Sequence, residues 1–222
     1  MRSCSVVART AFVAVLLTIP MLTGSAAQGG STSVKRVEPH TRPSTMRITP
    51  LEASKWTEAQ RQFLEPRGEG AQQAICVYNL GMCQKYWDFM GQITGRYTLP
   101  LRDKELLILR TAYLSRGNFV WGAHSTGNAK KAGMTAEEIA RIAQGPDAKG
   151  WSSFDAALLR AADELHTSRF ISNATWNALK ERYDESKLVE AILTVGGYTA
   201  LIMFHSSTGG PPLRPGMPGV PD

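Results

Sequence analysis

Two side chains in the middle of the chain have the types and spacing that proton transfer requires. Glu105 lies three and four residues before Ile108 and Leu109, so a helix would place its carboxylate on an apolar face. His124 lies three residues after Trp121, and an imidazole titrates near neutral pH. Burial and neighbouring charges alter the proton affinity of such groups. Glu105 and His124 therefore form a candidate acid/base pair on two consecutive helices.

Each of these residues also has a structural interpretation. Glu105 would stabilise a helix as an acid near its N-terminus, or would form an ion pair with an arginine. A single histidine on an apolar helix face is more often a hydrogen-bonded core residue than a catalytic one. No second histidine or carboxylate stands at metal-ligand spacing on the helix of His124, so we expect neither a metal site nor another cofactor.

Three further residues are candidates for substrate binding. Trp121 and Tyr198 would form an apolar wall beside the acid/base pair. Arg110 would hold a substrate carboxylate through its planar guanidinium, although an ion pair with Glu105 or another helix is the more ordinary use. Tyr198 and His205 lie seven residues apart, so they either line one pocket or act as a core residue and a helix-end residue.

The elements that carry these residues are predicted to be helices throughout. Apolar residues recur at helical spacing, strand-like alternation is absent, and three segments resemble capping boxes: Thr57 with Gln60, Thr135 with Glu138, and Ser152 with Asp155. The sequence therefore predicts an all-α bundle of seven to nine helices. The expected ranges are 56–65, 72–80, 82–95, 102–116, 118–132, 135–143, 153–167, 173–183 and 186–205.

Both ends of the chain differ in composition from this helical domain, which we place at 51–208. Residues 1–27 combine Arg2 and Arg9, an apolar run broken by Pro20, and a small-residue end, which is typical of a cleaved secretory signal peptide. The apolar run is shorter than the roughly 20 residues of a membrane span. We therefore expect a secreted or periplasmic protein with no stable membrane anchor after cleavage. Residues 28–50 read as a flexible arm. The Pro/Gly-rich tail 209–222 either wraps a neighbouring subunit or stays disordered.

Charge and cysteine content limit the partners further. The net charge is +6, but basic and acidic residues are interleaved, so nucleic acid is not an expected partner. Cys76 and Cys83 lie seven residues apart. On one continuous helix that spacing spans about 10 Å, more than the roughly 7 Å that a disulfide allows. A helix break at Asn79 or Gly81 would permit a disulfide, and we leave both alternatives open.

Five blocks of sequence, in this order, resemble one known family. They are Leu-Pro-Leu-Arg-Asp-Lys-Glu-Leu-Leu-Ile-Leu-Arg at 99–110, the Trp121-x-x-His124 step, Ala-Gly-Met-Thr-Ala-Glu-Glu-Ile at 132–139, Ala-Ala-Asp-Glu-Leu at 161–165, and Thr-Val-Gly-Gly-Tyr at 194–198. The chain resembles the carboxymuconolactone decarboxylase family, which includes the alkylhydroperoxidase D-like proteins. The resemblance covers about residues 75 to 205.

This resemblance implies an all-helical fold that assembles into homo-oligomers, trimers or hexamers, with a pocket near the helix of the histidine. In the thiol-peroxidase branch of the family, that helix bears a Cys-x-x-Cys pair before the histidine, and a glutamate on the preceding helix belongs to a proton relay. Glu105 and His124 match the relay positions, but Gly117 and Val120 stand where the cysteines would be. Decarboxylase-like relatives often carry acidic residues near the histidine, where this chain has Asn118 and Val120.

We therefore expect an exported, cofactor-free lyase, decarboxylase or isomerase that acts on a small organic acid or lactone. Glu105 and His124 would exchange protons with this small-molecule substrate. One alternative is a noncatalytic oligomer with a binding or structural role. Another is a peroxidase that uses Cys76 and Cys83, because peroxide reduction needs a thiolate. In a catalytic protein Glu105 and His124 should face one solvent-connected cavity, whereas in a noncatalytic one His124 would be sealed in helix packing.

Overall fold

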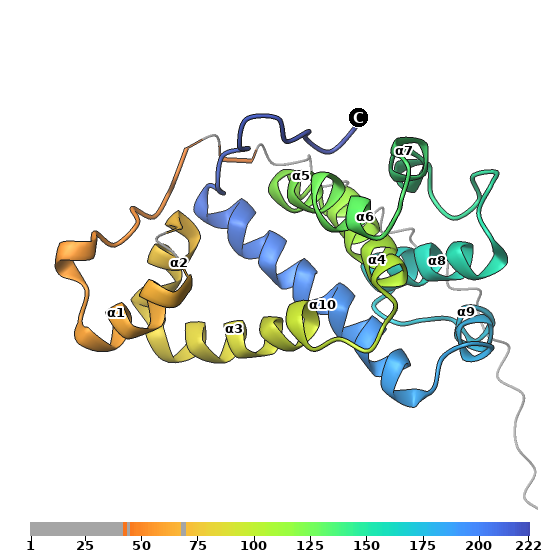
Figure 1. Cartoon of the computed structure of the whole chain (residues 1–222), viewed down its shortest axis with the longest axis horizontal. Helices are drawn as coiled ribbons and strands as arrows, with labels where there is room; N and C mark the ends of the chain where they lie inside the picture. The colour runs from red at the N-terminus through yellow and green to blue at the C-terminus, as the bar shows by residue number, and fades with distance from the viewer. Residues whose placement is uncertain (1–41, 44, 68–69) are drawn as a thin grey trace, which may run out of the picture. The chain divides into compact units, whose positions relative to one another are not determined.

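The computed structural model describes residues 42–43, 45–67 and 70–222. Over these residues the chain is all-helical, as predicted, and contains no strand (Figure 1). The helices are α1 (Glu58–Leu64), α2 (Ala71–Cys76), α3 (Leu80–Gly95), α4 (Leu101–Leu114), α5 (Asn118–Thr126), α6 (Asn128–Lys131), α7 (Ala136–Gln144), α8 (Ser153–Thr167), α9 (Asn173–Lys180) and α10 (Glu185–Thr208), with short 3-10 turns at Ala53–Lys55, Glu65–Arg67 and Val77–Asn79. The signal peptide predicted at 1–27 and most of the arm predicted at 28–50 lie outside the described residues.

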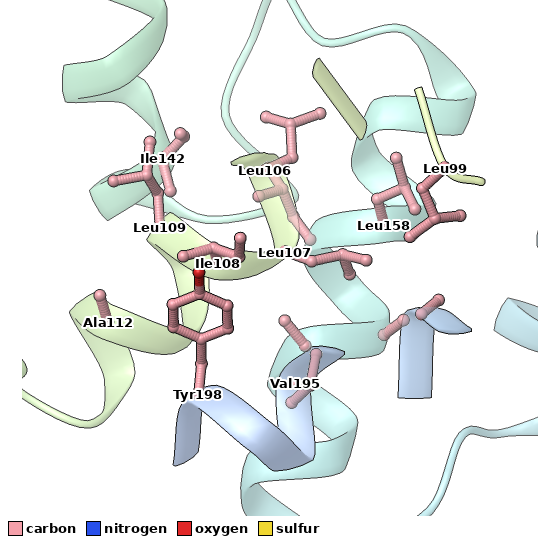
Figure 2. Close-up of a cluster of buried hydrophobic side chains, with 14 of the residues drawn as sticks. Leu99, Leu106, Leu107, Ile108, Leu109, Ala112, Ile142, Leu158, Val195 and Tyr198 are labelled. Atoms are coloured by element: carbon pink, nitrogen blue, oxygen red, sulfur yellow. The ribbon is translucent and has the colours of Figure 1, made fainter. Parts of the chain in front are cut away.

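Helix α4 is the centre of the main hydrophobic core. It packs against α5, α7, α8 and α10, and its side chains from Asp103 to Ala112 are all buried (Figure 2). Pro100 precedes α4 as its N-cap, with a φ of −52°, and its carbonyl accepts a hydrogen bond from the backbone N–H of Lys104. A helix enclosed on every side carries charged residues into the interior, and each of them needs a partner there.

Helix α10 is the second long element of this core, and it packs against α3, α4 and α8. By length and composition it is apolar enough to cross a membrane, but half of the qualifying stretch is buried inside the protein. A core helix passes the same test of length and composition, and the contacts of α10 with three other helices fit that description. Tyr198 and His205 both lie on its buried side.

The predicted helix starts are confirmed, with one difference. Thr57 with Gln60 and Thr135 with Glu138 form reciprocal capping boxes. The Ser152 side chain accepts from the Asp155 backbone N–H at 3.0 Å, but the box is not completed. The Asp155 carboxylate instead accepts from Arg102 at 3.2 Å. The Asp155 carboxylate therefore connects α8 to α4 and does not complete the cap of α8.

Two predicted helices are divided in the structure. The expected helix 118–132 is interrupted at Gly127, whose φ and ψ of −105° and −95° are not helical. The expected helix 72–80 becomes α2 and a 3-10 turn, and Asn79, the last residue of that turn, breaks the helix with φ −121° and ψ 77° before α3 begins. The Asn79 side chain then caps α3 by accepting from the Met82 backbone N–H at 3.3 Å.

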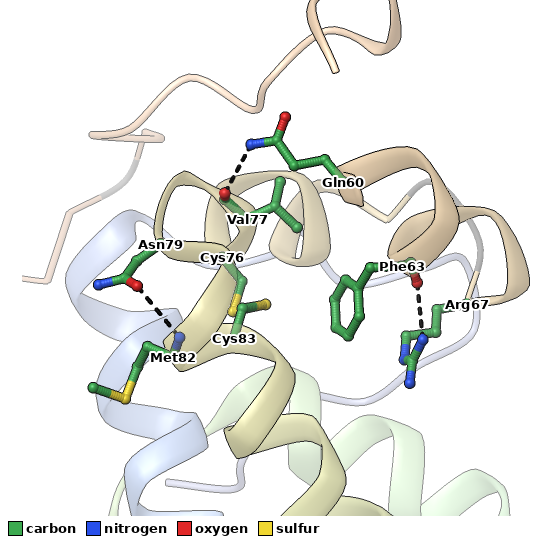
Figure 3. Close-up of a disulfide and its surroundings, with 8 residues drawn as sticks. All are labelled: Gln60, Phe63, Arg67, Cys76, Val77, Asn79, Met82 and Cys83. Atoms are coloured by element: carbon green, nitrogen blue, oxygen red, sulfur yellow. Dashed lines mark hydrogen bonds between the residues drawn. A yellow bond between two sulfur atoms is a disulfide. The ribbon is translucent and has the colours of Figure 1, made fainter. Parts of the chain in front are cut away.

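This second break allows a disulfide between Cys76 and Cys83, whose Cα atoms are 5.5 Å apart (Figure 3). Of the two alternatives left open above, the bridged one is therefore the one the structure adopts, and Asn79 supplies the break while Gly81 lies inside α3. Cys83 is buried in a small hydrophobic cluster with Trp56, Phe63 and Val77. That cluster is separate from the main core that contains Trp121 and Tyr198.

The C-terminal tail packs on its own chain, across helix α5. The Val220 backbone N–H donates to the Asn118 side-chain oxygen at 3.0 Å, and Arg116 donates to the Pro221 carbonyl at 2.8 Å. Gly122 permits the close approach, because a Cβ atom there would lie 2.7 Å from the Pro218 carbonyl oxygen. The tail therefore covers the face of α5 that carries Asn118 and Gly122.

Candidate functional site

Glu105 and His124 are in direct contact. The Glu105 Oε2 atom lies 2.7 Å from Nδ1 of His124, which is hydrogen-bond distance. The contact forms because the chain turns sharply after α4: Arg116 takes a left-handed φ of 52°, and the Gly117 N–H donates back to the Ala112 carbonyl at 2.7 Å. This turn returns α5 along α4, so that residues 19 apart in sequence meet. The structure thus brings together the acid and the imidazole that the sequence spacing paired.

Burial in this pair is unequal. The Glu105 side chain is 0% exposed, whereas His124 retains 14% of its side-chain surface. Since Nδ1 of His124 points at the buried carboxylate, Nε2 is the ring nitrogen that remains for a substrate. A buried carboxylate in this position holds the imidazole in one orientation, as a general acid or base requires.

Glu105 differs from the other buried charges of α4. Asp103 accepts from the Tyr183 hydroxyl at 2.7 Å, and Lys104 donates to the Ile93 carbonyl at 3.2 Å with Nζ over the Tyr97 ring. Glu105 keeps one oxygen, Oε1, buried without a hydrogen-bond partner among the described residues. An unpaired oxygen on a buried carboxylate is costly, and a catalytic role is one physical explanation for it.

Tyr198 completes the immediate surroundings of the histidine. Its ring meets the His124 ring edge to face, with ring centres 5.1 Å apart and an interplanar angle of 84°. Figure 2 shows the Tyr198 side chain extending from α10 toward the Ile108 segment of α4. Burial, together with the nearby charge of Glu105, raises the pKa of Tyr198. The hydroxyl is therefore protonated at neutral pH and is not a base in this site.

Trp121 lies apart from Glu105, His124 and Tyr198, although it is on the same helix as His124. It is buried, its ring centre is 6.3 Å from that of Tyr113, and it lines a cavity of about 390 Å3 between α5, α7 and the C-terminal tail. Neither His124 nor Tyr198 lines that cavity. The structure thus brings Glu105, His124 and Tyr198 together and places Trp121 on the neighbouring side of α5.

Arg110 is also engaged elsewhere. Its guanidinium donates to both carboxylate oxygens of Asp163 on α8, at 2.6 and 3.0 Å. It also donates to the carbonyls of Ile142 and Ala143 at the end of α7, at 2.8 and 3.0 Å. The group joins α4, α7 and α8 and caps α7, which corresponds to the structural alternative considered for it above.

Access to the pair is indirect. Four of the cavities that lie among the described residues are lined by neither Glu105 nor His124. One of these, of about 180 Å3 at the N-terminus of α5, has Val120 and Ile202 in its wall. Val120 lies one helical turn before His124 on α5, and Ile202 lies one turn after Tyr198 on α10. A catalytic protein was expected to have both side chains in one solvent-connected cavity, and a noncatalytic one to have His124 sealed in helix packing. The structure matches neither fully, because His124 is partly exposed but lines none of these cavities.

Some residues near the site were not singled out in the sequence. Thr194 lies one turn before Tyr198 on α10, and its hydroxyl is buried without a partner in the described part of the chain. The sequence signal that could have identified Thr194 is a polar residue within the apolar stripe of α10. His205, a candidate pocket residue, is buried beside Phe119 in the 180 Å3 cavity and not beside Tyr198. Within the described ranges there is no group of three histidine, cysteine or acidic residues that would hold a metal ion.

Comparisons with known proteins agree with this architecture. Residues 83–164, from α3 to α8, match the model of the Carboxymuconolactone decarboxylase family. No match was found among curated proteins. Among solved structures, a protein from Agrobacterium tumefaciens, described as of unknown function and as a candidate AhpD antioxidant defence protein, aligns with a TM-score of 0.54 at 13% identity. The alignment covers 59% of this chain and 90% of the Agrobacterium protein.

The debrominase Bmp8, solved alone and as a variant bound to 2,3,4-tribromopyrrole, aligns with a TM-score of 0.60 at 12% identity. The alignment covers 76% of this chain and 92% of the debrominase. At such low identity these likenesses establish the fold alone. The family match, in contrast, includes the helices of Glu105 and His124. The segment 83–164 therefore belongs to the carboxymuconolactone decarboxylase family, in a chain that has the AhpD-like fold and lacks the Cys-x-x-Cys pair.

Proposed function

We propose that this protein is a cofactor-free enzyme, a lyase, decarboxylase or isomerase, that transfers protons to and from a small organic acid or lactone. The observation that carries the proposal is the 2.7 Å contact between His124 Nδ1 and the fully buried carboxylate of Glu105. Such a pair holds an imidazole in one orientation and balances the positive charge that it gains when protonated.

In a decarboxylation the roles are as follows. The bond between the substrate carbon and the departing CO2 breaks, and its electron pair moves into the conjugated carbonyl or lactone of the substrate. His124 donates the Nε2 proton to this electron-rich system, and Glu105 holds the ring while it is charged. In an isomerisation, His124 takes a proton from one carbon and returns it to another. Tyr198 fixes the plane of the imidazole by its edge-to-face contact.

The peroxidase alternative has less support. The positions of the family's thiol pair hold Gly117 and Val120. Cys76 and Cys83 form a disulfide in a hydrophobic cluster that contains none of Glu105, His124 and Tyr198. The thiol pair therefore lies in a different cluster from the residues that surround His124.

A noncatalytic binding role has one specific observation in its favour. An apolar cavity of about 460 Å3 lies between α2, α3 and α10, beside the disulfide and away from the acid/base pair. A cavity of this size and character accommodates a small apolar molecule. In this second candidate function, the protein binds such a molecule, and Glu105 and His124 serve only the packing of α4 and α5.

Turnover by the purified protein distinguishes these functions. We expect the wild-type protein to convert at least one member of a panel of muconolactone-type acids and lactones, and to reduce no hydroperoxide. His124→Ala should lose at least about 100-fold in rate, because general acid–base catalysis contributes about 100- to 10,000-fold. The double variant Cys76→Ser/Cys83→Ser should keep its turnover. Peroxide reduction that disappears in the double serine variant would overturn the proposal, as would a folded protein with no turnover of any acid or lactone.

A further inference from the structure

A second polar cavity lies at the N-terminus of α5, and the proposed acid/base chemistry does not use it. Its volume is about 180 Å3. Its polar side chains are Arg42, Arg116, Asn118, His205 and Ser206, and its lining includes no aspartate or glutamate. A small cavity with two guanidinium groups and no carboxylate attracts an anion.

Neither arginine has an acidic partner in the described part of the chain. Arg42 donates to the Ser206 hydroxyl and to the Ser115 carbonyl, and Arg116 donates to the Pro221 carbonyl. A guanidinium has five N–H donors, so each arginine retains donors after these contacts. The contacts fix the two side chains at the cavity while leaving both charges without a counterion.

His205 supplies an independent observation. It is only 8% exposed, it lines the cavity, and no side-chain hydrogen bond of its ring is found among residues 42–43, 45–67 and 70–222. Its ring packs edge to face on Phe119, with centres 5.8 Å apart. Burial lowers the pKa of His205 to about 4, so the neutral ring offers one N–H donor at neutral pH. The ring therefore presents an N–H donor at the cavity wall to which an acceptor in the cavity can bind.

The start of α5 adds backbone donors to the same place. Gly117 is its N-cap and has no side chain to accept from the first-turn amides. Phe119 and Val120, in that first turn, both line the cavity. The amides at a helix N-terminus and the helix dipole both favour a bound anion.

We propose that this cavity binds a small oxyanion, either the carboxylate of an organic acid or a phosphate group. Arg42 and Arg116 supply the charge, His205 donates one hydrogen bond from the wall, and the first turn of α5 donates from the floor. Planar guanidinium groups match both kinds of oxyanion. In the opposing structural interpretation, the arginines only stabilise the C-terminal end of α10, and no anion binds.

The site has a second consequence, which rests on the proposed function. Val120 and Ile202 line the cavity, and one turn further along the same helices lie His124 and Tyr198, about 6 Å away along each axis. A small acid held at the cavity by its carboxylate would lie about one helical turn from the acid/base pair.

The test is calorimetric titration of the purified full-length protein with sodium acetate and, separately, with sodium phosphate, at constant ionic strength set by sodium chloride. We expect saturable binding of at least one anion to one site per chain. Arg116→Asn should weaken this binding about tenfold or more, because a charge-assisted hydrogen bond is lost. Asn tolerates the left-handed backbone that Arg116 adopts. Acetate-selective or phosphate-selective binding would identify the anion.

The matched control is Arg96→Asn. Arg96 is an exposed arginine that lines none of the four cavities, so its variant should bind as the wild type does. His124→Ala should also bind normally, so that a failure of the proposed catalysis is distinguishable from a failure of this site. The His205 ring resonances should shift on titration. Absence of saturable binding by the folded wild type, or equal weakening by both arginine variants, would overturn the proposal.

Discussion

The charged side chains buried on α4 divide into those that hold the fold together and one that does not. Asp103 and Lys104 each have a partner suited to their charge, and Arg110 has four hydrogen-bond contacts on α7 and α8. Glu105 is fully buried, yet one of its oxygens has no partner among the described residues. Its only polar contact there is His124. This difference is the physical reason for assigning chemistry to Glu105 rather than to its neighbours.

Arg110 gives a prediction at this scale. Arg110→Gln should lower the free energy of unfolding by about 3 kcal/mol, because it leaves the Asp163 carboxylate and the end of α7 without their partner. Denaturant unfolding measures the loss. The matched control is Arg160→Gln, whose ion pair with Asp147 is exposed, and it should change stability by less than about 0.5 kcal/mol.

The alternative role of Arg110 as a substrate anchor makes a different prediction for the same variant. If the guanidinium held the substrate, KM would rise in the folded variant while stability changed little. We expect unchanged KM at a temperature where Arg110→Gln is folded. Equal stability of the variant and the wild type would contradict the account given for Arg110.

Single residues differ in how far their roles were predictable from sequence. Glu105 and His124 lie on consecutive helices joined by a short turn, so local spacing was enough to pair them. The partner of Arg110, Asp163, is 53 residues away on a helix whose packing no local pattern reports. His205 was assigned to a shared pocket or to a helix end. Its spacing of seven residues from Tyr198 correctly placed both residues on the buried face of α10. The cavity at His205, however, is formed by three segments that are distant in sequence, and local spacing does not reveal it.

At the scale of elements, helix starts were more predictable than helix interiors. A threonine followed three residues later by glutamine or glutamate satisfies its own helix end, so Thr57 and Thr135 mark boundaries without tertiary information. The break at Gly127 left no comparable signal, since glycine is tolerated inside helices. The break at Asn79 was considered only because of the cysteines on either side of it.

The disulfide gives the prediction at this scale. Cys76→Ser/Cys83→Ser should lower the free energy of unfolding by about 2 kcal/mol, because the bridge closes a short loop and restricts the unfolded chain. The change should be seen in denaturant unfolding. Reduction of the wild-type protein should give the same loss, and reduction should not affect the double variant further. No difference between oxidised and reduced wild type would contradict a structural role for the bridge.

At the scale of the whole molecule, α10 presents an unusual surface. Val189, Leu193 and Met203 are exposed apolar residues at helical spacing on one side of α10, where Gly196 and Ala200 continue the same side. Exposed apolar stripes of this kind are typical of contacts between subunits. We propose that a second copy of the chain covers this stripe, in line with the homo-oligomer expected from the family resemblance.

Sedimentation velocity tests this proposal. Leu193→Glu should shift the protein to a smaller species, because a charge would be buried at the contact. Asn177→Glu, which adds the same charge to an exposed position on α9, should leave the sedimentation coefficient unchanged. A wild-type protein that sediments as a monomer would contradict the proposal.

The all-helical class of the described residues was predictable from helical spacing and caps, and the family match of residues 83–164 from sequence blocks in a fixed order. The tail was not, since its prolines exclude a helix but do not say which surface it covers. In the structure it covers α5 of its own chain through Asn118 and Gly122. The family match ends at residue 164, so Tyr198 and His205 reach the two candidate sites from a helix outside it.

The central claim is that Glu105 and His124 act as one catalytic unit, and a double-mutant cycle tests it most directly. The measurement is kcat/KM of Glu105→Gln, of His124→Ala and of the double variant, on whichever acid or lactone the wild type converts. We predict that the double variant is no slower than the slower single variant, because residues that act as a unit lose their effect together. Losses that multiply in the double variant, or full activity in either single variant, would contradict the account.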